Sequence, residues 1–129
     1  MSSAGNPSAA DPKATEAQRQ DFRRVALLDA MRREGRAWAD IAPPCGVADP
    51  EPPWKTCLDA TCECLDAGGA LPSLDRRLAE DALAEAMYGD VPNPERQLLA
   101  LVHTMLSRGL IGEAELARRV GIVRSRLAA

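Results

Sequence analysis

Four cysteines are the residues of this chain best suited to chemistry, because thiolates bind transition metals and attack electrophiles. Cys57, Cys62 and Cys64 lie within one stretch, EPPWKTCLDATCECLDAGGAL (51–71), and Cys45 precedes it. On a helix, Cys57 and Cys64 share a face, whereas Cys62 lies about 140° round from Cys57, so the three thiolates cannot converge unless the helix unwinds. We therefore expect the thiols to pack as small hydrophobic side chains and no metal to be bound stably. The alternative is a site that passes on cobalt or iron transiently, with Cys57, Cys62 and Cys64 as ligands and Cys45 as a fourth.

The other chemistry-bearing residues form no catalytic motif. The sequence has no Ser-His-Asp order, no HExxH pair and no glycine-rich phosphate loop. Its single histidine, His103, has no partner that the sequence suggests, so we expect a structural role for it. The net charge of -3 gives no general attraction to nucleic acid or to an anionic membrane. No apolar run approaches the roughly 20 residues of a membrane span, and the N-terminus lacks a secretory pattern, so we expect a cytoplasmic protein with reduced thiols.

The spacing of apolar residues predicts helices and no sheet, because no segment alternates with period two over any length. We expect an all-α fold, a small bundle of helical hairpins with a disordered N-terminal arm. The N-terminal helix begins with the capping pair Thr15 and Gln18 and carries Phe22 on its apolar stripe. The predicted divisions are a disordered arm (1–14), an N-terminal helical segment (15–42), a proline-rich connector (43–53) and a larger helical domain (54–129).

We expect the stretch 51–71 to organise this fold. Pro53 suits the first turn of its helix, and Gly68-Gly69 ends it. Trp54 should be largely buried, where it anchors the helix. The predicted buried face consists of Trp54, Leu58, Thr61 and Leu65, with the cysteines beside it.

A unit of helix, glycine stop and shorter helix recurs at Phe22–Ile41, Trp54–Met87 and Leu98–Leu127, with a spacing too uneven for a solenoid. Two of its helices, at about 73–87 and 113–127, should turn one apolar face inward. These faces are Leu74, Leu78, Leu83 and Met87 in the first, and Leu116, Val120, Val123 and Leu127 in the second.

Four arginines cluster in the last predicted helix: Arg118, Arg119, Arg124 and Arg126. Positive charge near a helix C-terminus is favourable in itself, because it complements the helix dipole. The functional interpretation is a basic contact to an acidic partner.

Residues 51 to about 127 resemble the N-terminal helical domain of nitrile hydratase β subunits and of their small β-like accessory proteins. The chain has neither the glycine-rich signature nor the β-barrel domain of the β subunits, which favours the accessory proteins. The residues that carry the resemblance, in chain order, are Pro53-Trp54, Gly69, Leu74-Asp75, Gly109-Leu110-Ile111, Glu115-Leu116 and Arg118-Arg119.

This resemblance implies a protein without an active site of its own. It would bind the α-type subunit of a nitrile hydratase-like metalloenzyme, or of a thiocyanate hydrolase, and assist its assembly or metal loading. Trp54 and the four arginines would contact that partner. The family's metal site belongs to the α subunit, in a C-x-x-C-x-C loop that the cysteine spacing here does not match. A non-catalytic, split β-type subunit of such an enzyme is the alternative.

A DNA-binding helix-turn-helix is the alternative from another class. The segment REGRAWADIAPPCGV (33–47) resembles two short helices joined by a turn. Pro43-Pro44 interrupts it where a recognition helix should start, and the acidic balance of the chain opposes DNA binding.

Overall fold

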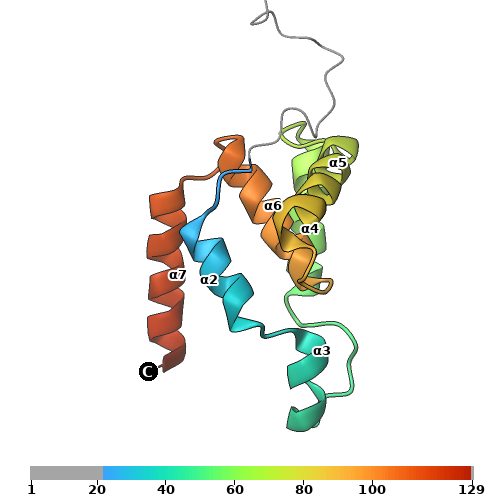
Figure 1. Ribbon diagram of the computed structural model, residues 1–129, viewed down its shortest axis with the longest axis vertical. Coiled ribbons are helices and arrows are strands. Elements are labelled where there is room, and N and C mark those ends of the chain that lie inside the picture. Colours follow the sequence, from blue (N-terminus) through green and yellow to red (C-terminus); the bar gives the residue numbers. More distant parts are fainter. Residues whose placement is uncertain (1–21, 129) are drawn as a thin grey trace, which may run out of the picture.

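The computed structural model describes residues 22–128, and this part of the chain is built from helices and turns without a strand. The predicted all-α class is therefore confirmed. The predicted arm (1–14) and the helix start at Thr15 lie outside the described residues. The helices are α2 (Ala26–Glu34), α3 (Trp38–Ile41), the 3-10 turn η1 (Pro43–Cys45), α4 (Lys55–Ala67), α5 (Ser73–Leu83), the π-helical turn η2 (Ala84–Tyr88), α6 (Glu95–Ser107) and α7 (Glu113–Ala128), shown in Figure 1.

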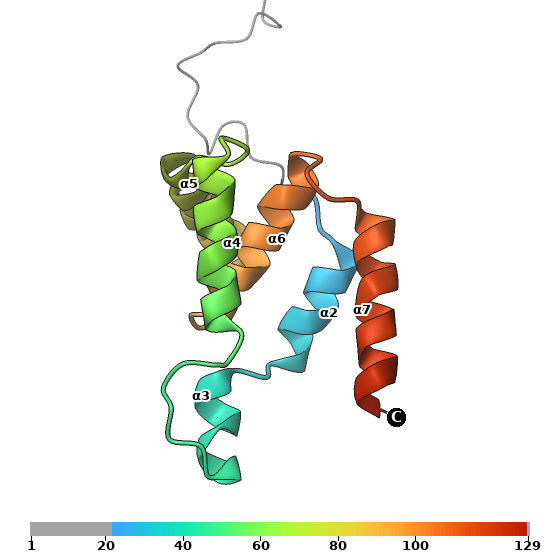
Figure 2. The same ribbon diagram turned by 180° about the vertical axis from the view of Figure 1, so that it is seen from behind.

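Helix α6, and not the stretch 51–71, is the centre of the bundle. It lies between α4 on one side and α2 on the other (Figures 1 and 2). Five of its residues are buried, on more than one face, whereas α4 buries only Leu58 and Cys62. A helix that is apolar on several faces belongs in the interior, which explains why α6 takes this place. The buried residues of α6 are Leu99, Ala100, Leu101, His103 and Thr104.

Two hydrophobic clusters flank α6. The larger joins α2, α5, η2 and α6, so the N-terminal helix shares a core with the rest of the described chain. The smaller joins α4 to the opposite side of α6. The buried members are Val25, Leu28, Leu83, Tyr88, Val91, Leu99 and Ala100 in the larger cluster, and Leu58, Cys62, Leu71 and Leu101 in the smaller.

The start of the N-terminal helix differs from its prediction. Residues 22–25 are not helical, and Phe22 is exposed, so it does not belong to a buried helical stripe. Val25 has extended backbone (φ -112°, ψ 116°) and enters the core from there. The predicted stop at Gly35 is confirmed: its φ of 63° lies in the left-handed region that glycine adopts without strain.

The buried faces of α4 and α5 are both rotated relative to the predicted stripes. In α4, Cys62 is buried and Thr61 is exposed. In α5, Leu74 and Leu78 are 65% and 39% exposed, while Ala79 and Leu83 are fully buried. A small side chain such as that of Ala79 permits close approach of the neighbouring α6, against which α5 packs.

The turn η2 carries Tyr88 into the core at the end of α5. Gly89 follows it, and a Cβ atom there would stand 2.7 Å from the carbonyl oxygen of Ala84. Glycine is therefore required at this position by close backbone approach, and it lets the chain leave the π-helical turn directly after Tyr88.

The hairpins α4–α5 and α6–α7 match residue for residue in their helical pattern as far as Leu83 and Val123, after which η2 is π-helical and α7 stays α-helical. Helices α4 and α6 start at Lys55 and Glu95 and contain 13 residues each, and α5 and α7 start at Ser73 and Glu113, so both starts are 40 residues apart. The predicted uneven spacing is wrong for these two units.

The turns inside the two hairpins are also alike. Gly69 and Gly109 have φ values of 77° and 71°, and each donates a hydrogen bond of 3.1 Å to the carbonyl three residues before it. The same backbone therefore occurs twice in sequence, and residues 40 apart occupy equivalent positions.

Candidate functional site

Helix α7 is the only described helix of eight or more residues that has no buried residue. None of its described residues is buried, and Leu127 and Val123 are 81% and 51% exposed. The prediction that Val123 and Leu127 face inward is therefore wrong, while Leu116 and Val120 are partly buried. A stripe with helical spacing shows which residues share a face, but it does not show whether a neighbour covers that face.

Two ion pairs connect α7 to the N-terminal part of the chain. Arg124 Nη2 lies 3.2 Å from Glu34 Oε1 of α2, and Arg23 Nη1 lies 3.4 Å from Glu113 Oε1. Both views place α7 beside α2, at the edge of the bundle (Figures 1 and 2). Exposed ion pairs of this kind contribute about 0–1 kcal/mol each, so α7 is held weakly.

The four predicted arginines are all on the surface of α7. Arg118 and Arg119 pair within the helix with Glu115, at 2.6 and 3.6 Å, and Arg124 pairs with Glu34. Arg126 has no ion pair with any residue that the structure describes. These pairs are solvent-exposed and weak, so the guanidinium groups remain available to a partner.

Trp54 does not share a surface with those arginines. It is half-buried, precedes α4, and packs against the smaller cluster beside Leu58. Figures 1 and 2 place α4 and α7 on opposite sides of the bundle, with α6 and α2 between them. The structure therefore separates the predicted partner residues into an anchor of the core and an exposed basic helix, and it does not bury Trp54 as fully as predicted.

The cysteines point in different directions. Cys62 is buried, and burial raises the pKa of its thiol, an effect that the nearby Arg76 guanidinium opposes. Cys45, Cys57 and Cys64 are exposed, so the predicted packing as small hydrophobic side chains holds only for Cys62. Within residues 22–128 no three His, Cys, Asp or Glu side chains gather as metal ligands. The α4 backbone is helical through all three of its cysteines, and in this conformation Cys62 is buried while Cys57 and Cys64 are exposed.

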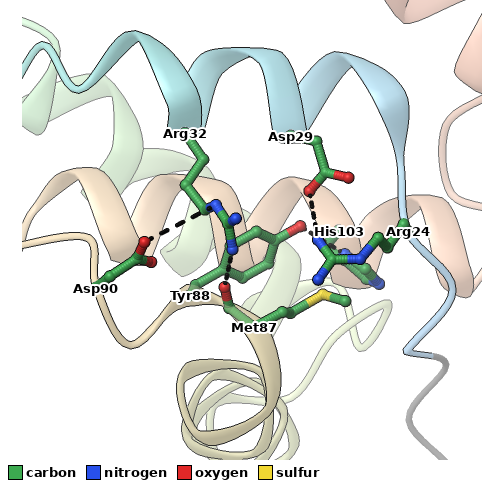
Figure 3. A network of polar contacts seen from close by, with 7 residues as sticks. All are labelled: Arg24, Asp29, Arg32, Met87, Tyr88, Asp90 and His103. Carbon is green, nitrogen blue, oxygen red and sulfur yellow. Dashed lines mark hydrogen bonds and ion pairs between the residues drawn. The ribbon is translucent and has the colours of Figure 1, made fainter.

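A buried polar pair joins η2 to α6. Tyr88 Oη lies 2.8 Å from His103 Nδ1, and the rings meet edge to face with centroids 5.7 Å apart (Figure 3). Both side chains are fully buried. Burial raises the pKa of Tyr88 to about 12, and the Asp29 carboxylate adds to this shift. The hydroxyl is therefore neutral at physiological pH, and the pair is a hydrogen-bonded part of the buried interior.

The Tyr88–His103 pair has charged neighbours on α2. Arg32 Nη1 donates a hydrogen bond of 2.7 Å to the carbonyl oxygen of Met87, and Arg24 Nη1 lies 3.2 Å from Asp29 Oδ1 (Figure 3). The Arg32 hydrogen bond joins α2 to η2, whereas the Arg24–Asp29 pair joins α2 to the segment just before it. Sequence reasoning missed the pair because its members are 15 residues apart and on different elements.

A cleft of about 370 Å³ lies between α2, α3 and the start of α6. Its lining combines apolar side chains such as Met31 and Leu99 with charged groups of both signs. Several of these groups already have partners: Glu95 Oε2, for example, accepts a hydrogen bond of 2.8 Å from the Trp38 backbone N–H. None of the predicted site residues lines this cleft.

Comparison with known proteins finds no match: no family model, no curated protein and no solved structure resembles the chain significantly. Among the described helices, none combines the length and the apolar character that crossing a bilayer requires.

Proposed function

We propose that this protein is an accessory protein that binds the α-type subunit of a nitrile hydratase-like metalloenzyme and assists its maturation. The observation that carries the proposal is the exposed helix α7. Helices gain most of their stability from packing an apolar face, and α7 leaves Val123 and Leu127 uncovered. A partner that buried these side chains would gain about 25 cal/mol for each Å² of apolar surface removed from water.

The positions of the resemblance support the proposal because they coincide with the ends of helices. Pro53-Trp54 immediately precedes α4, and Gly69 is the left-handed residue of its terminal turn. Gly109-Leu110-Ile111 forms the equivalent turn before α7. The matched residues are thus the ones that define the two hairpins, and Arg118-Arg119 lies on the exposed helix.

The geometry of the thiols favours assistance with assembly over transfer of metal. A transfer site needs two or more ligands that reach one ion, and Cys57 and Cys62 face solvent and core respectively. The non-catalytic β-type subunit is the second candidate function, because the same exposed helix would serve a permanent interface.

The helix-turn-helix alternative requires a recognition helix, and the helices in this segment are too short to serve as one. Helix α3 contains four residues and is followed directly by the 3-10 turn Pro43–Cys45. One helical turn is too short to lie in a major groove and present several side chains to bases.

Co-expression tests the proposal. The full chain, co-expressed with an α-type subunit that carries a C-x-x-C-x-C motif, should elute from gel filtration with it as one complex at micromolar concentration. Separate elution of the two proteins would contradict the proposal. If the complex persists after the α subunit has received its metal and its β subunit, the permanent-subunit alternative holds.

A further inference from the structure

We infer that α7 docks an acidic amphipathic helix of the partner, which packs on α7 as α6 packs on α5. This inference rests on the proposed function and assigns the surface and the chemistry of the contact. The outer face of α7 is defined here as Arg119, Ile122, Val123, Arg126 and Leu127.

The residue-for-residue match of the two hairpins supplies the first argument. Equivalent positions are 40 residues apart, so Leu83 of α5 corresponds to Val123 of α7. Leu83 is fully buried in the larger cluster, which includes α6 residues, whereas Val123 is 51% exposed. The first hairpin therefore shows what covers this face when a neighbour is present: an apolar helix. In the described chain no apolar helix covers this face of the second hairpin: α2 is joined to α7 by the Glu34–Arg124 pair, and Arg23, which precedes α2, pairs with Glu113.

The spacing of the outer face supplies the second argument. Its positions follow the order i, i+3, i+4, i+7 and i+8, which is the stripe that an amphipathic helix normally turns to a neighbour. On a helical wheel the centre of the stripe points about 130° away from Arg124, the residue that pairs with α2. The whole stripe is exposed, with Leu127 at 81%.

The charges on the outer face of α7 determine what kind of helix can cover it. The position equivalent to the fully buried Ala79 of α5 holds Arg119, whose side chain is 71% exposed. Arg126 lies two turns further on the same stripe. A neighbour that covers Val123 and Leu127 must therefore place carboxylates opposite these guanidinium groups, since an unpaired charge is costly to bury.

The same charges exclude a second copy of this chain as the occupant. The outer face has two arginines and no acidic residue. Pairing two outer faces around a two-fold axis would bring like charges together, which costs free energy at an interface. An acidic amphipathic helix from another protein satisfies both the apolar and the charged positions.

The test uses the full chain and the co-expressed α-type subunit, with two variants of the outer face. Leu127→Asp removes apolar area, and the double change Arg119→Glu with Arg126→Glu reverses the charge. Each should weaken the dissociation constant at least about tenfold in a calorimetric titration. Raising the salt concentration should weaken the wild-type complex, because salt screens the attraction between opposite charges, and it should not weaken the complex of the charge-reversed protein.

Matched controls come from α5. Leu74→Asp alters a leucine that is 65% exposed, and Arg77→Glu alters an exposed arginine, both away from α7. The controls should change the dissociation constant less than about twofold. Circular dichroism should show unchanged helix content in every variant, because all altered side chains are exposed.

The possible outcomes separate the two proposals. A wild-type complex that tolerates both outer-face variants as well as it tolerates the controls overturns the inference and leaves the proposed function standing. Absence of a wild-type complex overturns the proposed function, and the inference with it. A wild-type homodimer that Leu127→Asp dissociates overturns the choice of an acidic partner.

Discussion

The hairpins α4–α5 and α6–α7 share their helical pattern as far as Leu83 and Val123, but they differ in how far their second helices are buried. In the first hairpin, α5 buries Ala79 and Leu83 and ends in a π-helical turn that carries Tyr88 into the core. In the second, α7 buries none of its described residues. First helices of equal length and similar glycine turns therefore determine how a hairpin is shaped, but not which of its faces is covered.

The difference follows from the position of α6. Helix α6 is the first helix of the second hairpin, and it is buried on several faces. The first hairpin packs against it with both helices. Helix α7 leaves it after the Gly109 turn, and its ion pairs to other described segments are the two weak ones with Glu34 of α2 and with Arg23. We regard the uncovered α7 as the functional part of the molecule for this reason.

The sharpest test of the comparison alters the equivalent pair Leu83 and Val123. Leu83→Ala should lower the free energy of unfolding by about 2–5 kcal/mol, because it leaves a cavity beside Tyr88 and Leu99. Val123→Ala should lower it by less than about 0.5 kcal/mol. Urea denaturation measures both values. Equal losses would show that α7 is packed in solution, which would contradict the exposure on which its proposed role depends.

The next largest effect concerns the Tyr88–His103 pair, which has no counterpart in the second hairpin because the position equivalent to Tyr88 is Ala128. Tyr88→Phe removes the hydroxyl and leaves His103 Nδ1 buried without that partner. We expect a loss of about 1–3 kcal/mol in the free energy of unfolding. A phenylalanine variant as stable as the wild type would show that the pair contributes packing alone.

The pair also predicts a dependence on alkaline pH. The pKa of Tyr88 rises from 10.0 to about 12 on folding, so between these values the unfolded state loses its proton first. The stability that this group contributes is therefore complete below pH 10 and is lost as the pH rises toward about 12. The difference in unfolding free energy between wild type and Tyr88→Phe should shrink over this range, as measured by denaturation at a series of pH values.

Local signals in the sequence predicted the helix ends well. Gly35, Gly69 and Gly109 end their helices in the left-handed region, and Pro43 ends α3, because turn chemistry depends only on neighbouring residues. The buried faces were predicted less well. Apolar residues occur on two faces of α5. The face that is buried, with Ala79 rather than Leu74, is determined by packing against α6, which lies about 20 residues later in the chain.

The candidate site shows the same limit. The arginines of α7 were predicted as a partner contact and are indeed exposed, yet Trp54 lies on the far side of the bundle. The spacing of Cys57 and Cys62 predicted that they do not converge, and the helix places them accordingly. Whether a neighbouring helix covers a given apolar stripe depends on how all the helices pack together. A local sequence pattern therefore cannot predict it.

A smaller change in stability is expected from substitutions in the two glycine turns. Gly69→Ala and Gly109→Ala each place a Cβ in the left-handed region with nothing within 4 Å, so each costs only backbone strain, about 1–2 kcal/mol. Gly69→Ala should lower the global free energy of unfolding, because α4 and α5 both belong to the core. Gly109→Ala should instead speed amide exchange in α7 alone. Loss of protection throughout the bundle in Gly109→Ala would contradict the weak attachment of α7.

The smallest expected effect concerns Cys62, whose equivalent in the second hairpin is Val102. If Cys62 only packs, Cys62→Val should change the free energy of unfolding by less than about 1.5 kcal/mol, since valine has a similar size and is accepted at the equivalent position. Cys57→Ala and Cys64→Ala, on the exposed side of α4, should change it still less.

These variants also test cobalt binding. A titration followed by absorbance should show no thiolate charge-transfer band, because the helix holds Cys62 toward the core and Cys57 toward solvent. A stoichiometric band that Cys62→Val abolishes would mean that α4 unwinds to bind metal, and α4 would then replace α7 as the functional helix.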